Sequence, residues 1–178
     1  MFIFGVWTGL RISDLQRINQ FLFTKNTIII SETEKTGAMI EIPIHQQVKE
    51  ILAKRNGQFP KIISSQKFND YIKDVCQLAG ITEMTLGNIK NSKTNRKEKG
   101  YYPKYKLISS HSARRSFATN HYGKLPDHTI MAITTHKSHS QFMKYIKTTQ
   151  QEHIEQVAKY WEQQDDLKNA KNNLKISL

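Results

Sequence analysis

The stretch SHSARRSFATNH, residues 110–121, places a histidine and an arginine three residues apart, His111 and Arg114. Residues at i and i+3 lie on one face of a helix, so these two side chains are predicted to converge. Phe117 indicates that an adjoining face is buried, which places the pair at the edge of a core. Arg115 is expected to point elsewhere and to meet backbone phosphate or solvent.

Four further polar residues lie far from this pair in the sequence. They are Arg11 after a Gly-Leu turn, Lys35 near a predicted hairpin tip, His136, and Tyr145 nine residues after His136. Each has an ordinary structural interpretation when taken alone: a surface arginine, a turn lysine, a loop histidine and a half-buried aromatic residue. Only the combination indicates a particular chemistry.

Two arginines, a lysine, two histidines and a tyrosine, with neither carboxylate nor metal, suit phosphoryl transfer on a nucleic-acid backbone. Guanidinium groups stabilise the negative charge on non-bridging phosphate oxygens. Histidine and lysine move protons to and from bridging oxygens. A tyrosine hydroxyl can act as the nucleophile and form a phosphotyrosine, which conserves the bond energy without ATP.

The sequence predicts no metal site and no cofactor. His136 and His139 have the spacing HxxH, but they lie in a predicted loop with no carboxylate close by. Zinc requires three or four ligands with supporting hydrogen-bond acceptors. Cys76 is the single cysteine, which excludes a disulfide framework and a cysteine-based zinc site and fits a reducing cytoplasm.

The charge of the chain indicates a polyanionic partner. Lysine and arginine total 27 against 15 acidic residues, a formal net charge of +12, and nucleic acid is the usual partner at such an excess. A protein that is merely basic and soluble is the alternative. Residues 90–106 concentrate the charge between three tyrosines, and the candidate phosphate contacts are Lys90, Lys93, Arg96, Lys97, Lys99, Lys104 and, outside this stretch, Arg115.

The predicted elements form a mainly α domain with one small antiparallel sheet. The apolar opening, residues 1–11, is interpreted as the tail of a core helix, and RISDLQRI, residues 11–18, as a short helix. Strands are predicted at 27–31 and 39–44, with Pro43 marking an edge or an end. No apolar run approaches the length of about 18 residues that a membrane span requires.

Helices are predicted over most of the remaining chain. The predicted ranges are 45–55, 64–80, 110–122 with a cap at Ser109 or Ser110, 126–134, 140–147 and 150–165, the last followed by a polar tail. The helix at 64–80 is expected to bury Phe68, Ile72, Val75 and Leu78-Ala79. Residues 88–106 lack an apolar period and are interpreted as a loop or a distorted strand pair.

In their order along the chain, these residues resemble the tyrosine recombinases, the phage-integrase family. TGLRISDL resembles the family's first arginine motif, with Arg11 as the arginine and Asp14 as its supporting acid. TEKTG followed by IEIPI resembles the hairpin of the catalytic lysine, which makes Lys35 the candidate. HSARRSFAT matches the His-x-x-Arg motif with His111 and Arg114.

THKSHSQFMKYIK resembles the family's last motif, in which His136 precedes the nucleophile Tyr145 by the usual interval. The family usually has glycine directly before this histidine, and this chain has Thr135. The resemblance extends over about residues 1–160 and implies the family's catalytic-domain fold. It also implies that residues 1–164 are a catalytic domain with a shortened first helix and no core-binding domain, and that 165–178 are a tail.

The resemblance implies a metal-independent enzyme that cleaves and rejoins double-stranded DNA through a 3′-phosphotyrosine. Its expected partners are an attachment site on DNA, three further copies in a synaptic tetramer and an accessory DNA-bending protein, in a bacterial cytoplasm. The tail either docks on a neighbouring subunit or is a frayed terminus. Three alternatives stay open: a type IB topoisomerase-like activity, a non-catalytic DNA-binding relative and a plain basic interaction domain.

Overall fold

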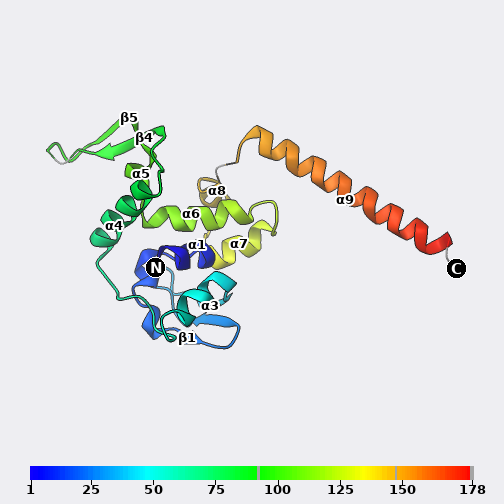
Figure 1. The fold of residues 1–178 in the computed structure, drawn as a ribbon, viewed down its shortest axis with the longest axis horizontal. Coiled ribbons are helices and arrows are strands. Elements are labelled where there is room, and N and C mark those ends of the chain that lie inside the picture. The colour runs from blue at the N-terminus through cyan, green and yellow to red at the C-terminus, as the bar shows by residue number, and fades with distance from the viewer. Residues whose placement is uncertain (92, 147, 177–178) are drawn as a thin grey trace.

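A computed structural model of the chain describes residues 1–91, 93–146 and 148–176, with the side chains of the last segment described as far as Asp166. Figure 1 shows a body of short helices and two small sheets, from which one long helix projects. In chain order the elements are α1 (Phe2–Thr8), α2 (Ile12–Leu15), a 3-10 turn η1 (Ile18–Gln20), β1 (Leu22–Phe23), β2 (Thr27–Ile30), β3 (Ile40–Pro43), α3 (Gln46–Ala53), α4 (Ser65–Leu78), β4 (Met84–Lys90), β5 (Lys97–Pro103), α5 (Lys104–Leu107), α6 (Ser110–His121), α7 (Asp127–Thr134), α8 (His139–Met143) and α9 (Gln150–Ile176). The predicted mainly α fold with a small antiparallel sheet is confirmed.

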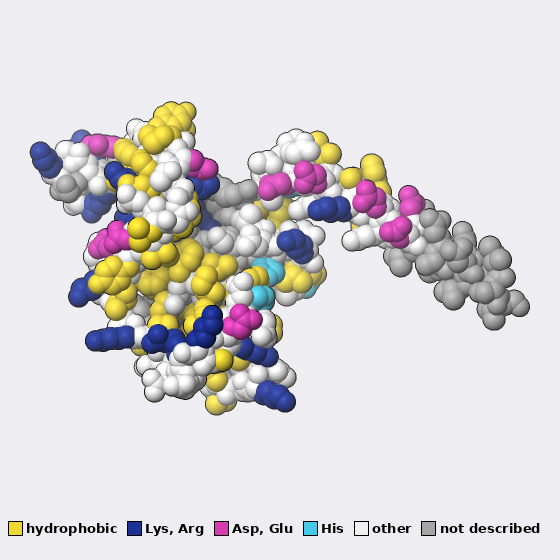
Figure 2. Space-filling view, viewed as in Figure 1, with side chains coloured by type: hydrophobic (Ala, Val, Ile, Leu, Met, Phe, Trp, Pro, Cys, Tyr) yellow, Lys and Arg dark blue, Asp and Glu magenta, His cyan; other side chains and the backbone are white. Residues whose placement is uncertain are grey.

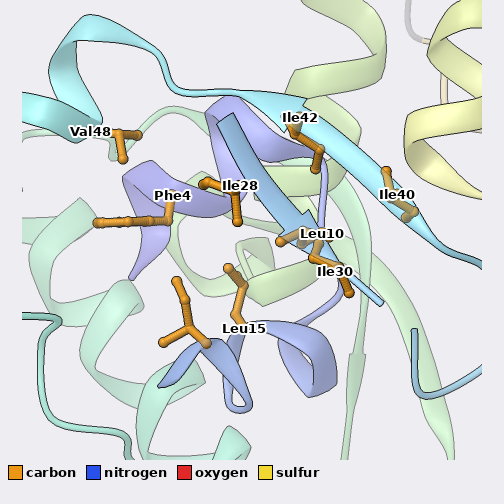
Figure 3. Packing of buried hydrophobic residues seen from close by; sticks show 9 residues of the cluster. Phe4, Leu10, Leu15, Ile28, Ile30, Ile40, Ile42 and Val48 are labelled. Atoms are coloured by element: carbon orange, nitrogen blue, oxygen red, sulfur yellow. The ribbon is translucent and has the colours of Figure 1, made fainter. Parts of the chain in front are cut away.

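The first core lies between the three-stranded sheet and the helices α1, α2 and α3. The strand order is β1-β2-β3 and both pairings are antiparallel. Side chains alternate across β2 and β3, so Ile28, Ile30, Ile40 and Ile42 all point inward and are buried with Phe4 (Figure 3). Because β3 is an edge strand, Pro43 removes no bond from the interior of the sheet, as predicted.

The second core surrounds α6, which packs along α1 and against α7. Phe117 and Ala118 of α6 are buried with Ile130 of α7 and Phe142 of α8. A capping box begins α6. The Ser109 side chain accepts a hydrogen bond from the backbone N–H of Ser112, and the Ser112 side chain accepts one from the backbone N–H of Ser109. The predicted burial of one face of this helix is confirmed, and α6 is therefore a rigid support for the residues at its start.

The predicted burial on α4 is confirmed for Phe68 and Ile72 but was wrong for Val75 and Leu78-Ala79. Phe68, Ile72 and Cys76 are buried, whereas Val75 is 56% exposed and Leu78 is 88% exposed. The buried residues follow the i, i+4, i+8 row of the helix. Apolar residues also occupy the neighbouring row, so periodicity alone did not identify the face that packs on the body.

Strands β4 and β5 pair regularly, whereas residues 88–106 were expected to form a loop or a distorted strand pair. Seven register pairs, from Met84↔Pro103 to Lys90↔Lys97, join β4 and β5. The inner face of this strand pair packs on α5. The Leu107 side chain lies so near Gly87 that a Cβ atom on residue 87 would come within 2.5 Å of Cδ2 of Leu107. The outer face is exposed and the inner face is only partly buried. The two strands therefore contain no run of apolar residues from which they could have been predicted.

Two helix ends differ from the predictions. Helix α8 ends at Met143 rather than near 147, so Tyr145 lies in the turn that follows it. Helix α9 continues to Ile176 rather than ending near 165, because no glycine or proline interrupts the sequence after Thr149. The apolar ending NLKISL of the predicted tail lies outside the described side chains. None of the helices in the described part of the chain is both long and apolar enough to cross a membrane.

Gly9 links the two cores at the end of α1. Its backbone is left-handed, with φ of 64°, and a Cβ at this position would lie 2.6 Å from Cδ1 of Phe117. Glycine is thus required here both for its conformation and for the close approach of α6. Its carbonyl oxygen also accepts a hydrogen bond of 2.8 Å from Nη1 of Arg114.

We expect Gly9→Ala to lower the free energy of unfolding by about 2–4 kcal/mol, the sum of left-handed strain and overpacking. Gly57→Ala is the matched control, because Gly57 is also left-handed, with φ of 78°, but has nothing within 4 Å of its Cβ position. Urea denaturation of both variants measures the difference. Equal losses would show that Gly9 is needed for its backbone conformation alone.

Candidate active site

The six residues singled out from the sequence line one cleft of about 640 Å³. Five separate segments form it: the start of α2, the β2–β3 loop, the start of α6, the α7–α8 loop and the turn after α8. The six residues are Arg11, Lys35, His111, Arg114, His136 and Tyr145. The structure therefore brings together residues that are as much as 134 positions apart in the sequence, from 11 to 145.

Arg114 is the largest fully buried side chain at the base of this cleft, with 1% of its surface exposed. Nη1 donates to the carbonyl of Gly9, while Nε and Nη2 are buried without a hydrogen-bond partner. Burial and the charge of Arg11 lower the pKa of Arg114 to about 10, against the opposing effects of Tyr145 and Asp14. The group is still a cation at neutral pH, and it has two free donors for an anion.

Arg11 precedes the first turn of α2 and crosses the cleft toward the α7–α8 loop. Its Nη1 donates a hydrogen bond of 2.9 Å to Oγ1 of Thr135. Thr135 has a left-handed backbone, with φ of 51° and ψ of 39°, a conformation that costs a β-branched residue about 1–2 kcal/mol. Thr135 thus has a backbone conformation that glycine adopts without strain, and its side chain adds a hydroxyl to the cleft.

Asp14 lies behind the cleft and holds the loop that carries Lys35. Its carboxylate is buried, and Oδ1 accepts a hydrogen bond of 2.9 Å from the backbone N–H of Glu34. Thr33 closes the same loop by accepting from the N–H of Ala38 at 3.1 Å. Lys35 is exposed at the rim, on a loop that is fixed to α2 and to itself.

His136 has a defined tautomer. The hydroxyl of Thr134 donates its one proton to the carbonyl of Ile130 at 2.6 Å, so it accepts from Nδ1 of His136 at 2.7 Å. Nδ1 therefore carries the proton of the neutral ring, and the buried, unpartnered Nε2 presents a lone pair. Burial, followed by the charges of Arg114 and Arg11 and by His111, lowers the pKa of His136 to about 4.

Tyr145 lies between the two histidines. Its ring centroid is 4.4 Å from that of His136 and 5.0 Å from that of His111, both edge-on. The Thr119 hydroxyl donates to the backbone carbonyl of Tyr145 at 3.2 Å and ties the turn to α6. The guanidinium carbon of Arg115 lies 5.5 Å from the centre of the Tyr145 ring.

Arg115 is exposed, as expected, but it does not lie wholly apart from the pair. It lies at the edge of the same cluster, because the turn after α8 crosses over the start of α6. His111 is exposed at the mouth of the cleft, and partial desolvation together with Arg115, Arg114, Arg11 and Lys35 lowers its pKa. The neutral form of this imidazole is favoured at neutral pH.

Sequence reasoning missed the residues that hold the six in place. Gly9, Thr33, Thr134 and Thr135 act through backbone and hydroxyl contacts, and small polar residues give no periodic signal. Lys137, Gln141 and Lys144 also line the cleft. Lys137 directly follows the candidate His136, and this position in the sequence could have predicted that it lies in the cleft.

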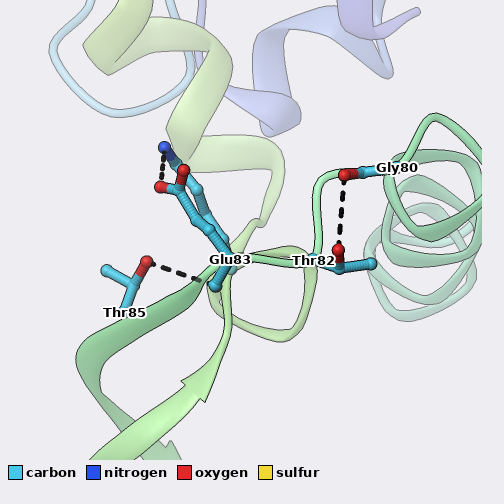
Figure 4. Close-up of polar contacts among 5 residues, drawn as sticks. Gly80, Thr82, Glu83 and Thr85 are labelled. Carbon is cyan, nitrogen blue, oxygen red and sulfur yellow. Dashed lines mark hydrogen bonds and ion pairs between the residues drawn. The ribbon is translucent and has the colours of Figure 1, made fainter.

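The basic stretch is separate from the cleft residues and lies on the β4–β5 ribbon. Figure 2 shows lysine and arginine side chains at the outer end of the ribbon and acidic side chains along α9. Cross-strand pairing places Lys90 opposite Lys97 and Lys99 opposite Asn88, so all four side chains lie on the exposed face. Lys104, by contrast, forms an ion pair with Glu83 at the base of the ribbon (Figure 4).

The second histidine of the HxxH spacing lies apart from the first. Nε2 of His139 is 2.8 Å from Oδ2 of Asp127, which joins the starts of α7 and α8. Among the described side chains, those of residues 1–91, 93–146 and 148–166, no three histidine, cysteine or acidic groups gather as metal ligands would.

Comparison with solved structures relates this arrangement to known proteins. The chain superimposes on the Tn1549 transposon integrase in complex with circular intermediate DNA with a TM-score of 0.53 and 16% identity, over 83% of this chain and 52% of that one. On the XerH site-specific recombinase bound to a palindromic difH substrate the TM-score is 0.56 at 19% identity, over 90% of this chain and 44% of that one. The fold is that of a tyrosine recombinase catalytic domain.

The chain spans about half the length of these two structures. By sequence, it matches neither a family model nor a curated protein. The likeness in structure thus shows the recombinase fold, and the roles of the individual residues in the cleft rest on the geometry described above.

The lowered pKa of His136 predicts that acid destabilises the fold. The folded chain holds this histidine in its neutral form, whereas in the unfolded chain the histidine has a pKa of about 6.5. Protonation of this residue therefore does not reduce the free energy of unfolding as long as the pH is above about 6.5. The fold therefore loses stability as the pH falls from about 6.5 toward 4, because the unfolded chain binds the proton more tightly than the folded one. Urea denaturation at pH 6.5 and pH 5 should show a smaller loss in His136→Gln than in the parent chain, and an equal loss would contradict the assignment.

Proposed function

We propose that this chain is the catalytic part of a site-specific DNA recombinase, an integrase that cleaves and rejoins DNA strands through a 3′-phosphotyrosine. The observation that carries the proposal is the gathering of Tyr145, Arg114 and His136: Tyr145 lies near enough to Arg114 to oppose the lowering of the guanidinium pKa by burial, its ring centroid lies 4.4 Å from that of His136, and Nε and Nη2 of Arg114 are buried donors without a partner. Unpaired buried donors are unfavourable in an empty site. A phosphodiester supplies the negative oxygens that would satisfy them.

In the proposed cleavage step the Tyr145 hydroxyl attacks the phosphorus of the DNA backbone. The new bond joins phosphorus to the tyrosine oxygen, and the bond that breaks joins phosphorus to the 5′-oxygen of the next nucleotide. His111 accepts the hydroxyl proton, for which its lowered pKa and neutral form suit it. Lys35 donates a proton to the leaving 5′-oxygen from the rim of the cleft.

The remaining groups stabilise the charge of the transition state. Arg11 and Arg114 donate to the non-bridging oxygens, and their positions are set by Thr135 and Gly9 before substrate binds. His136 becomes a donor only when Nε2 is protonated, which the negative charge of a bound phosphodiester favours. The reverse attack by a 5′-hydroxyl of a partner strand completes strand exchange without metal or nucleotide.

Two other activities fit the same cleft. A type IB topoisomerase-like enzyme would relax one duplex instead of exchanging strands between two, and a non-catalytic relative would bind DNA without forming an adduct. The structural likeness to an integrase and a recombinase, each solved with DNA, favours strand exchange. Joining of strands from two differently labelled duplexes distinguishes recombinase from topoisomerase.

The proposal extends to the assembly. Residues 1–164 would form the catalytic domain, and 165–178 would reach a neighbouring subunit in a tetramer on two recombination sites, with a DNA-bending protein assisting in a bacterial cytoplasm. Mass photometry of the chain mixed with DNA that carries one candidate site counts the subunits. If no complex contains more than one protomer per DNA molecule, the proposal of a tetramer is wrong.

We expect the chain to form a covalent adduct with DNA that carries a 5′-bridging phosphorothiolate, and the adduct should survive denaturing electrophoresis and form in EDTA. Tyr145→Phe should reduce adduct formation below detection, because it removes the nucleophilic oxygen. Tyr71→Phe, on the exposed surface of α4, is the matched control and should react like the parent chain. An adduct with Tyr145→Phe would show that another residue is the nucleophile.

The exposed face of the β4–β5 ribbon is proposed to contact DNA phosphates through Lys90, Lys97 and Lys99, with Lys93 and Arg96 near its turn and Arg115 at the cleft. Each phosphate contact contributes about 0.9 to the slope of log K against log salt concentration. Replacing Lys90, Lys97 and Lys99 together by Gln should therefore reduce that slope by about 3.

Fluorescence anisotropy with a duplex at several salt concentrations measures this slope. Because Lys104 is paired with Glu83, Lys104→Gln should change the slope less than any of the three. The exposed Lys49 of α3 supplies a control for net charge. A triple variant with the parent slope would show that the ribbon lies away from DNA.

A further inference from the structure

We propose that Thr135 is a positioning residue that holds Arg11 against the repulsion of Arg114, and that its hydroxyl is the reason for a threonine in a strained turn. The inference rests on the proposed function, because it assigns Thr135 a part in the same reaction. It concerns a residue at which this chain departs from the family's usual glycine.

The backbone at Thr135 is one for which threonine is poorly suited. Helix α7 ends at Thr134, and the N–H groups of Thr135 and His136 return to the carbonyls of Ala132 and Met131 at 3.2 and 3.0 Å. This closure requires a left-handed residue at position 135, which glycine adopts without strain and β-branched residues resist. Backbone strain in a folded protein indicates that another interaction at the residue compensates for it.

The compensating interaction is the hydrogen bond from Arg11. Oγ1 of Thr135 accepts from Nη1 of Arg11 at 2.9 Å, across 124 positions of sequence. Both residues line the cleft. Within the described part of the chain, this is the hydrogen bond that fixes the Arg11 guanidinium, whereas Arg114 is held by burial and by the carbonyl of Gly9.

Electrostatics make such a tether necessary. The charge of Arg11 acts unfavourably on Arg114, His111 and His136, all of which share the cleft. Asp14 is the buried carboxylate beside them, but its Oδ1 is used by the backbone N–H of Glu34. Before a phosphate binds, the cations favour an outward rotation of the half-exposed Arg11 side chain, and the hydroxyl of Thr135 opposes that rotation.

The test compares Thr135→Ser, Thr135→Val and Thr135→Gly. Serine keeps the hydroxyl, valine keeps the shape without it, and glycine removes it while relieving the strain. With saturating phosphorothiolate DNA, we expect serine to form the covalent adduct within about threefold of the parent rate. Valine and glycine should be slower by about 10- to 100-fold, as for a misplaced transition-state group, although glycine should not lower the urea midpoint.

Asn56→Gly is the matched control for relief of strain, because Asn56 is also left-handed, with φ of 53°, and lies outside the cleft. It should form the adduct at the parent rate. A Thr135→Gly or Thr135→Val variant that reacts as fast as the parent chain would overturn the proposal. So would a slow Thr135→Ser variant with a normal urea midpoint, because the hydroxyl would then not be the property that matters.

A second measurement uses the free protein and needs no reaction. The side-chain 15N–1H signals of Arg11, assigned with Arg11→Lys, should show restricted guanidinium motion in the parent chain and in Thr135→Ser, but fast motion in Thr135→Gly. If the parent chain forms no adduct, the proposed function fails, and the signals still report whether Thr135 holds Arg11. Unchanged guanidinium motion in Thr135→Gly would overturn the tether.

Discussion

The buried guanidinium of Arg114 is the interaction on which the rest of the structure depends. Removing a cation from water is unfavourable unless its donors are paired, and here one donor is paired with the carbonyl of Gly9 while two are left for a ligand. That pairing requires α1 to end where it does, and it requires α6 to lie close enough for Phe117 to touch Gly9. The two cores are thus packed around a site that is incomplete without an anion.

Positive charge dominates the cleft, and contacts from backbone groups, hydroxyls and one buried carboxylate hold it together. Burial is the main cause of the lowered pKa values of Arg114 and His136, and repulsion from the charge of Arg11 lowers both further. The groups that oppose this repulsion are a backbone carbonyl, a buried carboxylate used by a loop amide, and the hydroxyls of Thr134 and Thr135. Such contacts position the cations without neutralising them, which preserves their attraction for phosphate.

Much of the fold and of the cleft could be predicted from the sequence because the relevant signals are local. The spacing of His111 and Arg114 on one helix predicted their convergence, and the alternation of Ile40 and Ile42 predicted the strand that ends the Lys35 loop. Burial on α4 could be predicted only for Phe68 and Ile72, since two neighbouring rows of that helix are apolar and tertiary packing decides which of them is buried. The role of Thr135 could not be predicted, because it depends on a contact 124 residues away.

The long-range contacts of the cleft also determine when it can form during synthesis. Arg114 is joined to Gly9 across 105 residues and Arg11 to Thr135 across 124, and closing such long loops slows folding. The ribosome adds about 5–20 residues per second, so Arg11 is made several seconds before its partner loop. A nascent chain therefore displays Arg11 and the basic residues of the β4–β5 ribbon well before the cleft can form, and Tyr145 is the last of the six cleft residues to be made. A chain that stops before position 145 therefore lacks the tyrosine that the proposed cleavage step requires.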